Sequence, residues 1–204
     1  NKGWGWKDVL PYFIKSESQE RGKNEYHGDK GPLSVSDPRI KLDLLEKFMD
    51  AAEEKGIPKV DDFNKGNNFG CGYFQVTEKN GLRCSAAVGY LNPIKKRKNL
   101  KIETNCHVQK INFEGKKAVS ISFWKDSKSN TIKANKEILL SAGSIGSTQI
   151  LQASGIGNGS KLSNLGIKVI NELKGVGQNL QDHLMFRPVY KIENIKSLNK
   201  KINS

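Results

Sequence analysis

Two short stretches of the sequence place small residues beside groups that could contact a ligand. The first is residues 141–147 (SAGSIGS), which follow the apolar run 138–140 and precede a helical pattern. Small side chains let a ligand approach the backbone, and the start of a helix presents free N–H groups at the positive end of its dipole. This arrangement suits the phosphate groups of a dinucleotide. An ordinary connection from a strand to a helix has the same local pattern, so these residues alone favour neither interpretation.

The second stretch is residues 175–183 (GVGQNLQDH), where a glycine turn leads into polar and ionisable side chains. It is not a complete G-x-G-x-x-G fingerprint, because Leu180 stands where the last glycine should be, and no complete fingerprint of that kind occurs in the chain. Taken alone, this stretch is more typical of a capped helix start than of a binding site.

The cysteines and histidines do not form a metal-ligand pattern. They are scattered, with no C-x-x-C pair and no H-E-x-x-H sequence. Their positions are Cys71, Cys84, Cys106, His27, His107 and His183. We therefore expect three reduced thiols in a cytoplasmic protein, and no metal site.

The charge is strongly basic: 34 Lys and Arg against 21 Asp and Glu in 204 residues, a net charge of +13. The excess is mostly Lys, spread along the chain, and the densest run is residues 95–98 (KKRK). Base-reading modules favour Arg and interleaved aromatic residues, so we expect a solvated basic surface and no nucleic-acid partner. A basic nucleic-acid- or surface-binding module without enzymatic activity remains the alternative. No apolar window is long enough to predict a transmembrane span, and peripheral association with a membrane stays open.

The first half of the chain predicts helices separated by turns. Asp8 can cap a short helix that holds Pro11 in its first turn. A second helix, ended by Gly56 and Pro58, is indicated by apolar residues at helical spacing. These residues are Leu42, Leu45, Phe48, Met49 and Ala52. Residues 61–84 are glycine-rich and irregular, a type of long loop that often lines a ligand cavity, and Ser85 can cap a third helix through Leu91.

From residue 99 the apolar period changes to two. The alternation, broken by turns at 114–116 and 126–130, predicts a β-meander of three strands. Residues 137–140 (EILL) form a continuous apolar run, which is typical of a strand buried on both faces in a parallel sheet. A helix that carries Ile150 and Leu151 follows, and residues 154–157 (SGIG) close it. The expected fold class is α/β, with mixed α+β character.

Together, these stretches resemble the glucose–methanol–choline (GMC) family of flavin oxidoreductases. Residues 143–157 (GSIGSTQILQASGIG) are similar to that family's second signature, except that Thr148 stands where Pro or Ser is usual. Further matches follow in the family's order and spacing, which resemble its choline dehydrogenase-like and bacterial alcohol dehydrogenase branch most. They include WGW (4–6) with LPYF (10–13), YHG (26–28) with GPL (31–33), GLR (81–83), and NLQDH (179–183).

The resemblance implies an FAD-binding domain that is interleaved in sequence with a substrate domain. Residues 1–16 would be a helix of the extended flavin region, 17–86 a segment of the substrate or cap domain, 87–187 the middle segment of the FAD-binding domain, and 188–204 the start of a second substrate-domain segment. On this interpretation the chain is an internal piece of a longer protein. The family's G-x-G-x-x-G unit and its catalytic histidine would lie outside it, so we expect no catalytic residue within it.

The resemblance also implies the residues that contact FAD. Val108 matches a valine whose backbone meets the adenine end, and Gly143 and Ser144 lie where the family's turn approaches the cofactor. Asp182 and His183 match a loop packed by the flavin domain, where a structural hydrogen bond is an equal alternative to ligand contact. The full enzyme would oxidise a primary alcohol, choline-like or another, to an aldehyde by hydride transfer to flavin N5. We expect this chain alone to be inactive. The particular alcohol, the distinction between oxidase and dehydrogenase, and the oligomeric state stay open.

Overall fold

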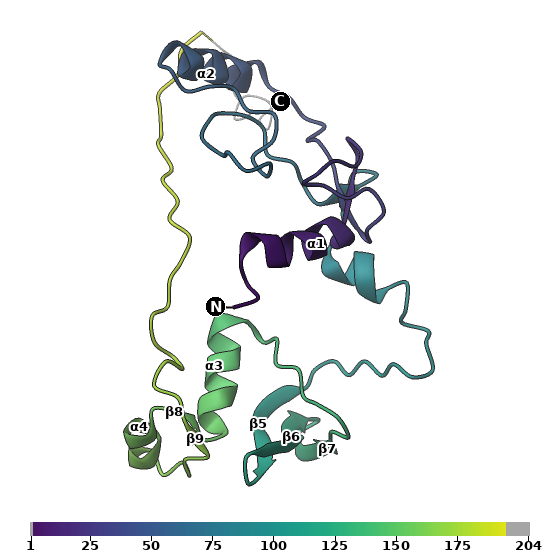
Figure 1. Ribbon diagram of the computed structural model, residues 1–204, viewed down its shortest axis with the longest axis vertical. Coiled ribbons are helices and arrows are strands. Elements are labelled where there is room, and N and C mark those ends of the chain that lie inside the picture. The colour runs from purple at the N-terminus through teal and green to yellow at the C-terminus, as the bar shows by residue number, and fades with distance from the viewer. Residues whose placement is uncertain (1, 195–204) are drawn as a thin grey trace. The chain divides into compact units, whose positions relative to one another are not determined.

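The computed structural model describes residues 2–194, which form two compact units. Among these residues, unit 1 comprises 2–101 with 189–194, and unit 2 comprises Ile102–Pro188. Both contain helices and short strands (Figure 1), which agrees with the expected mixed α/β fold class. Within residues 2–194, no helix is long and apolar enough to cross a membrane.

Unit 1 begins with a helix that continues directly into a strand. Helix α1 (Trp6–Ser16) starts after Gly5, and strand β1 (Glu17–Gln19) pairs in parallel with β2 (Leu33–Val35). Asp8 is the third helical residue and not the N-cap as predicted: its Oδ2 accepts the Gly5 N–H at 3.0 Å. The helix therefore starts earlier than expected, and Pro11 lies inside it rather than in its first turn.

Glycines at 28 and 31 let two backbone segments touch. A Cβ at Gly28 would lie 1.9 Å from the Ile14 carbonyl oxygen, and one at Gly31 would lie 2.2 Å from the Ser16 carbonyl carbon. The same approach allows the Gly31 N–H to donate to Glu17 O at 2.8 Å. The YHG…GPL sequence is thus a site of close backbone packing against the junction of α1 and β1.

The remaining helices and loops of unit 1 largely agree with the predictions from the sequence. Helix α2 (Asp43–Glu54) ends before Gly56, whose φ of +81° suits a helix terminus. The segment 61–84 is mostly irregular, as predicted, but ends in a hairpin of β3 (Glu78–Lys79) and β4 (Leu82–Arg83). Ser85 Oγ accepts the Val88 N–H at 3.3 Å, as expected of a cap. The helix that follows, η1 (Ala87–Leu91), is a π-helix.

Unit 2 contains the predicted meander. Strands β5 (His107–Glu114), β6 (Lys117–Lys125) and β7 (Lys128–Lys133) form one antiparallel sheet in that order. Asp126 and Ser127 both have positive φ in the second turn, the backbone that a two-residue hairpin requires. The sheet confirms the predicted three-stranded meander, but its bounds differ from the prediction: residues 99–106 are irregular, and β7 begins at Lys128, inside the turn predicted over 126–130.

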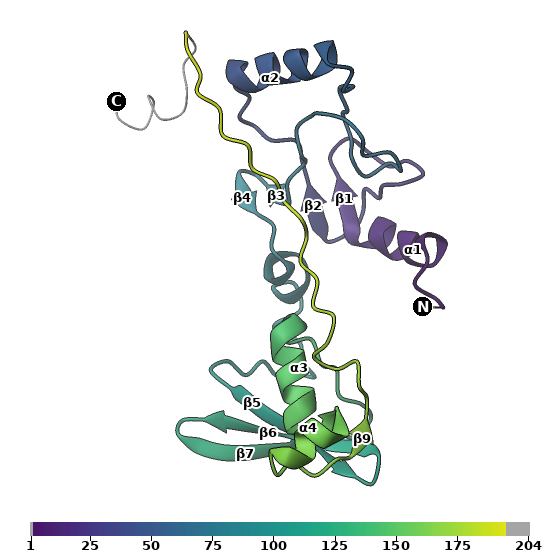
Figure 2. The ribbon, with the colours of Figure 1, turned by 90° about the vertical axis from the view of Figure 1, so that its left-hand side faces the viewer.

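Helix α3 (Gly143–Ala153) packs against β5, and Figure 2 shows the two elements side by side. Gly155, with φ of +84°, ends the helix as expected. A two-stranded parallel sheet follows. It pairs β8 (Ile156–Gly157) with β9 (Asn171–Glu172), and α4 (Gly159–Asn164) lies between these strands in the sequence. The sequence pattern did not predict β8, β9 or α4.

The predicted buried strand over 137–140 is wrong for this chain. These residues are irregular, and Leu139 is 81% exposed. A strand buried on both faces needs neighbouring strands to pair with and layers that cover it, but residues 137–140 join neither the β5-β6-β7 sheet nor the parallel β8-β9 pair of unit 2. The apolar run therefore has no strand to pair with among the described residues.

Candidate functional site

The N-terminal end of α3 has the features of an anion site. Its N-cap residue, Ala142, has no side-chain oxygen and makes no capping hydrogen bond. The first N–H groups of a helix have no partner within the helix, and the dipole makes this end positive. The amides at the start of α3 are therefore available to an anionic group.

Gly143 and Ser144 form this end of the helix and are exposed. Gly143 has φ of +78°, a conformation that strains other residues, and a Cβ there would meet nothing within 4 Å. The space beside the turn is therefore open. An open, positively polarised helix end fits a phosphate group of a dinucleotide.

Val108 lies near the start of β5, the edge strand of the sheet. It is half-buried opposite Phe123, and the register shifts between Val108 and Lys110. Farther along the same strand, the Ile111 N–H donates to Ser154 Oγ at 2.8 Å, which fixes β5 to the end of α3. Val108 thus belongs to the element that carries α3, but no hydrogen bond joins it to Gly143 or Ser144 within residues 2–194.

The glycine turn of the second stretch packs on α3. A Cβ at Gly177 would lie 2.7 Å from Gln152 Nε2 and 3.2 Å from Thr148 Cγ2, and its φ is +76°. Only a residue without a side chain fits there easily, so the turn holds the following residues next to the helix.

Asp182 and His183 follow that turn and are exposed. The His183 N–H donates to Asp182 Oδ1 at 2.8 Å. In the described part of the chain, no hydrogen bond or ion pair joins either residue to α3 or β5. Their contact with a cofactor stays a prediction.

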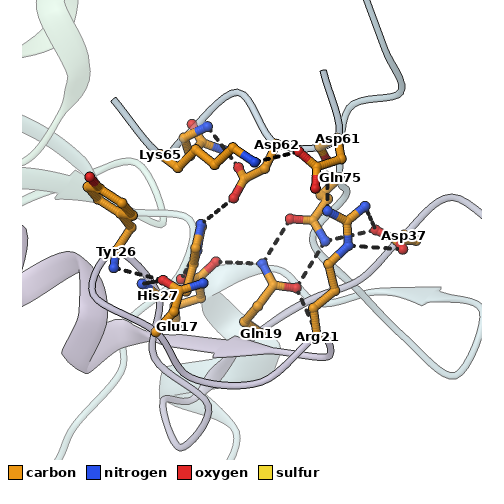
Figure 3. Close-up of polar contacts among 12 residues, drawn as sticks. Glu17, Gln19, Arg21, Tyr26, His27, Asp37, Asp61, Asp62, Lys65 and Gln75 are labelled. Atoms are coloured by element: carbon orange, nitrogen blue, oxygen red, sulfur yellow. Dashed lines mark hydrogen bonds and ion pairs between the residues drawn. The ribbon is translucent and has the colours of Figure 1, made fainter. Parts of the chain in front are cut away.

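Unit 1 contains a buried charged cluster that the sequence analysis did not single out. The His27 side chain is 5% exposed; Nδ1 lies 2.8 Å from Glu17 Oε2 and Nε2 lies 2.9 Å from Asp62 Oδ2 (Figure 3). Both ring nitrogens donate when the ring carries both protons, and the cluster then has two negative charges and one positive charge. The YHG sequence is the only local signal for it, because its partners lie 10 and 35 positions away.

A chain of side chains extends from this cluster (Figure 3). Gln19 donates to Glu17 and exchanges hydrogen bonds with Gln75, which donates to Asp37. Arg21 also donates to Asp37, with a contact of 2.7 Å. Burial alone would raise the pKa of the Asp37 carboxyl, but the hydrogen bonds from Arg21 and Gln75 outweigh it, so the pKa is lower than the ordinary value.

The His27 cluster borders an open cavity of about 510 Å³ within unit 1. Four of its thirteen lining residues are Trp, Phe or Tyr, and the irregular segment 61–84 contributes part of the wall. The lining includes Trp6, Phe13, Glu17, Tyr26, His27 and Phe63. Among residues 2–194, no group of three or more His, Cys, Asp or Glu side chains could hold a metal ion. In the His27 cluster, the imidazole lies between the carboxylates and occupies the position that a cation would take.

The comparisons with known proteins converge on one family. The GMC oxidoreductase family model matches residues 1–185. Oxygen-dependent choline dehydrogenase of Pectobacterium carotovorum is 45% identical over 184 residues, which is 89% of this chain and 33% of the relative. Human mitochondrial choline dehydrogenase is 43% identical over 183 residues, 90% of this chain and 31% of the relative. The chain therefore belongs to the GMC oxidoreductase family.

Solved structures agree with this assignment. An FAD-dependent oxidoreductase from Chaetomium thermophilum is 35% identical with a TM-score of 0.83, covering 89% of this chain and 34% of that one. Pyridoxine 4-oxidase from Mesorbium loti is 30% identical with a TM-score of 0.82, covering 90% and 36%. The chain spans about a third of the length of these relatives. All four are oxidoreductases, so they give no support to the alternative of a basic binding module.

Proposed function

We propose that this chain is an internal part of an FAD-dependent oxidoreductase that oxidises a primary alcohol to an aldehyde, and that it contains the middle segment of the FAD-binding domain. The observation that carries the proposal is the match of residues 1–185 to the GMC family. Identity of 45% and 43% to two choline dehydrogenases supports choline or a similar small alcohol as the substrate. We place the protein in the cytoplasm, without a nucleic-acid partner.

The cofactor-binding role falls on unit 2. The amides at Gly143 and Ser144 would hold a phosphate of FAD, because they form the positive end of α3 and the space beside them is open. The backbone of Val108 would meet the adenine, whose amino edge a strand-edge backbone can recognise. When bound, FAD supplies the acceptor for the hydride that leaves the alcohol carbon.

The other expected boundaries belong to the same proposal. Residues 1–16 and 87–187 would serve the flavin domain, and residues 17–86 and 188–204 the substrate domain. The expectation for 188–204 falls largely on residues 195–204, which lie outside the described part of the chain. The residue that removes the alcohol proton is proposed to lie in polypeptide beyond this chain, because none of His27, His107 and His183 stands in a sequence that resembles the family's catalytic histidine motif.

A hybrid enzyme tests the proposal. In this hybrid, the matched part of this chain replaces the 184 matched residues of the Pectobacterium carotovorum enzyme. We expect choline, or another primary alcohol in a small panel, to bleach the flavin of the hybrid under anaerobic conditions. A folded, flavin-loaded hybrid that no alcohol in the panel reduces would contradict the proposed activity.

Two substitutions at one position test the role of Val108. A backbone contact predicts that Val108→Thr leaves flavin content unchanged, whereas Val108→Pro, which removes the N–H, lowers it. Equal flavin content in the two folded variants would show that the backbone of Val108 does not hold the adenine.

We also expect the chain expressed alone to lose flavin on purification, since it spans about a third of its relatives. Stoichiometric flavin in that sample would contradict this expectation.

A further inference from the structure

The sequence contains two Asn–Gly pairs, at residues 80–81 and 158–159. An asparagine before glycine is prone to lose ammonia, because the backbone nitrogen of a residue without a Cβ approaches the side-chain carbonyl carbon unhindered. The reaction needs only water and no enzyme. Which pair reacts therefore depends on how the fold holds each asparagine side chain.

Asn80 and Gly81 form the two-residue turn between β3 and β4. Their φ angles are +53° and +78°, the positive values that such a hairpin turn requires, and Lys79 pairs with Leu82 across it. Among residues 2–194, the side-chain amide of Asn80 has no hydrogen-bond partner. No hydrogen bond from the described chain thus restrains this amide beside the nitrogen of Gly81.

Glu78 supplies a proton acceptor at the same turn. The Gly81 N–H donates to Glu78 Oε1 at 3.0 Å, which is within the reach of a general base. The nitrogen of Gly81 must give up this proton before it can form a new bond to carbon. The turn therefore brings together an unrestrained amide, the attacking nitrogen and a carboxylate that contacts its proton.

Asn158 is held in a different way, as the N-cap of α4. Its Oδ1 accepts the Lys161 N–H at 3.1 Å and the Ser160 hydroxyl at 2.7 Å. The side chain must leave both donors before the nitrogen of Gly159 can attack it. The cap therefore protects the second pair.

We propose that Asn80 is a site of spontaneous deamidation, with Glu78 as the proton acceptor, and that the fold protects Asn158. The nitrogen of Gly81 forms a bond to Cγ of Asn80 while Glu78 takes the N–H proton. The Cγ–Nδ2 bond then breaks, and the leaving amide takes that proton and departs as ammonia. Water opens the resulting cyclic imide to aspartate or isoaspartate, which adds one negative charge to the turn.

The contacts behind this proposal lie within residues 78–83 and 158–161. Each set belongs to one unit, so the proposal does not depend on how the two units are placed, nor on flavin or alcohol chemistry.

Mass spectrometry of peptic peptides tests the proposal on the folded 204-residue chain after incubation in mildly alkaline buffer. We expect Asn80 to convert about five-fold faster than Asn158, the factor by which a typical N-cap favours its helix. Equal conversion of the two sites, or faster conversion of Asn158, would overturn the proposal. In urea the cap is lost, so the two rates should approach each other; an undiminished difference would assign it to local sequence and overturn the role of the fold.

Three variants test the contacts separately. Glu78→Gln should slow conversion of Asn80 several-fold in chains that circular dichroism shows to be folded, whereas Glu25→Gln should leave it unchanged. An unchanged or faster rate in Glu78→Gln would overturn the proton transfer to Glu78. Ser160→Ala removes one of the two donors to Asn158 and should speed conversion at that site; an unchanged rate there would contradict protection by the cap.

Discussion

Replacing His27 by Ala should be among the most destabilising single changes in unit 1. The substitution removes both contacts of the ring, at 2.8 Å to Glu17 and 2.9 Å to Asp62. It also leaves the carboxylates of Glu17 and Asp62, 17% and 11% exposed, without the ring nitrogens that they contact. Unpaired buried charge is far more costly than the loss of a surface ion pair.

The expected loss can be worked out from these contacts. A hydrogen bond to a charged group contributes about 1.5–3 kcal/mol, so two such bonds contribute about 3–6 kcal/mol. Breaking a buried ion pair by removing one partner costs about 3–5 kcal/mol. The two estimates overlap near 4 kcal/mol, which is a large share of the stability of a typical domain.

Urea denaturation of the 204-residue chain, followed by circular dichroism and by hydrogen exchange in residues 14–35, measures this loss. His183→Ala is the matched control: that histidine is exposed, so its removal should change the free energy of unfolding by less than about 0.5 kcal/mol. Asp62→Asn, alone and combined with His27→Ala, completes a double-mutant cycle. The reasoning fails if His27→Ala costs less than about 1 kcal/mol or if the cycle shows no coupling.

Three further changes test other parts of the structure. Gly177→Ala should destabilise unit 2 by about 1–3 kcal/mol in urea denaturation, since it forces positive φ on alanine beside α3; Gly175→Ala, where a Cβ meets nothing within 4 Å, should be close to neutral. Ser154→Ala should cost about 1–3 kcal/mol in the same assay, because it leaves the Ile111 N–H without its acceptor; an unchanged midpoint would contradict this. Because the pKa of Asp37 is lowered in the folded chain, the unfolded chain binds more protons in acid. The contribution of the Asp37 carboxylate to the free energy of unfolding is therefore complete above about pH 4, and it is lost as the pH falls through the pKa of the folded chain. Asp37→Asn should flatten that acid loss in urea midpoints measured against pH, and an unaltered slope would refute the assignment.

Local patterns predicted the elements that depend on neighbouring residues. The meander follows from alternating apolar residues and turn positions, and Asp126 and Ser127 adopt the positive φ that their hairpin needs. Helix α2 and its end at Gly56 follow from helical spacing and a glycine stop. These features require only contacts between residues close in sequence, which is why the sequence alone specifies them.

Features that depend on distant partners were predicted poorly. The run 137–140 has the composition of a buried strand, but its state depends on strands that pair with it, and no strand among residues 2–194 does so. His27 is separated from Asp62 by 35 positions, so no periodic pattern announces their contact. The YHG…GPL motif was recognised by resemblance, and only the structure gives its physical reason, the backbone approach at Gly28 and Gly31.

The site residues divide in the same way. Gly143 and Ser144 were singled out by a small-residue turn before a helix together with the family resemblance, and the structure places them at the open start of α3; their contact with a cofactor stays a prediction. The contacts of Asp182 and His183 depend on what packs around residues 179–183. Their place in a binding site therefore stays a prediction.

The FAD content of the purified hybrid tests the central claim most directly. If this chain contains the middle segment of a GMC FAD-binding domain, the folded hybrid should carry close to one FAD per chain, measured by flavin absorbance against protein concentration. A folded hybrid without flavin, prepared under conditions in which the parent enzyme is fully loaded, would contradict the account.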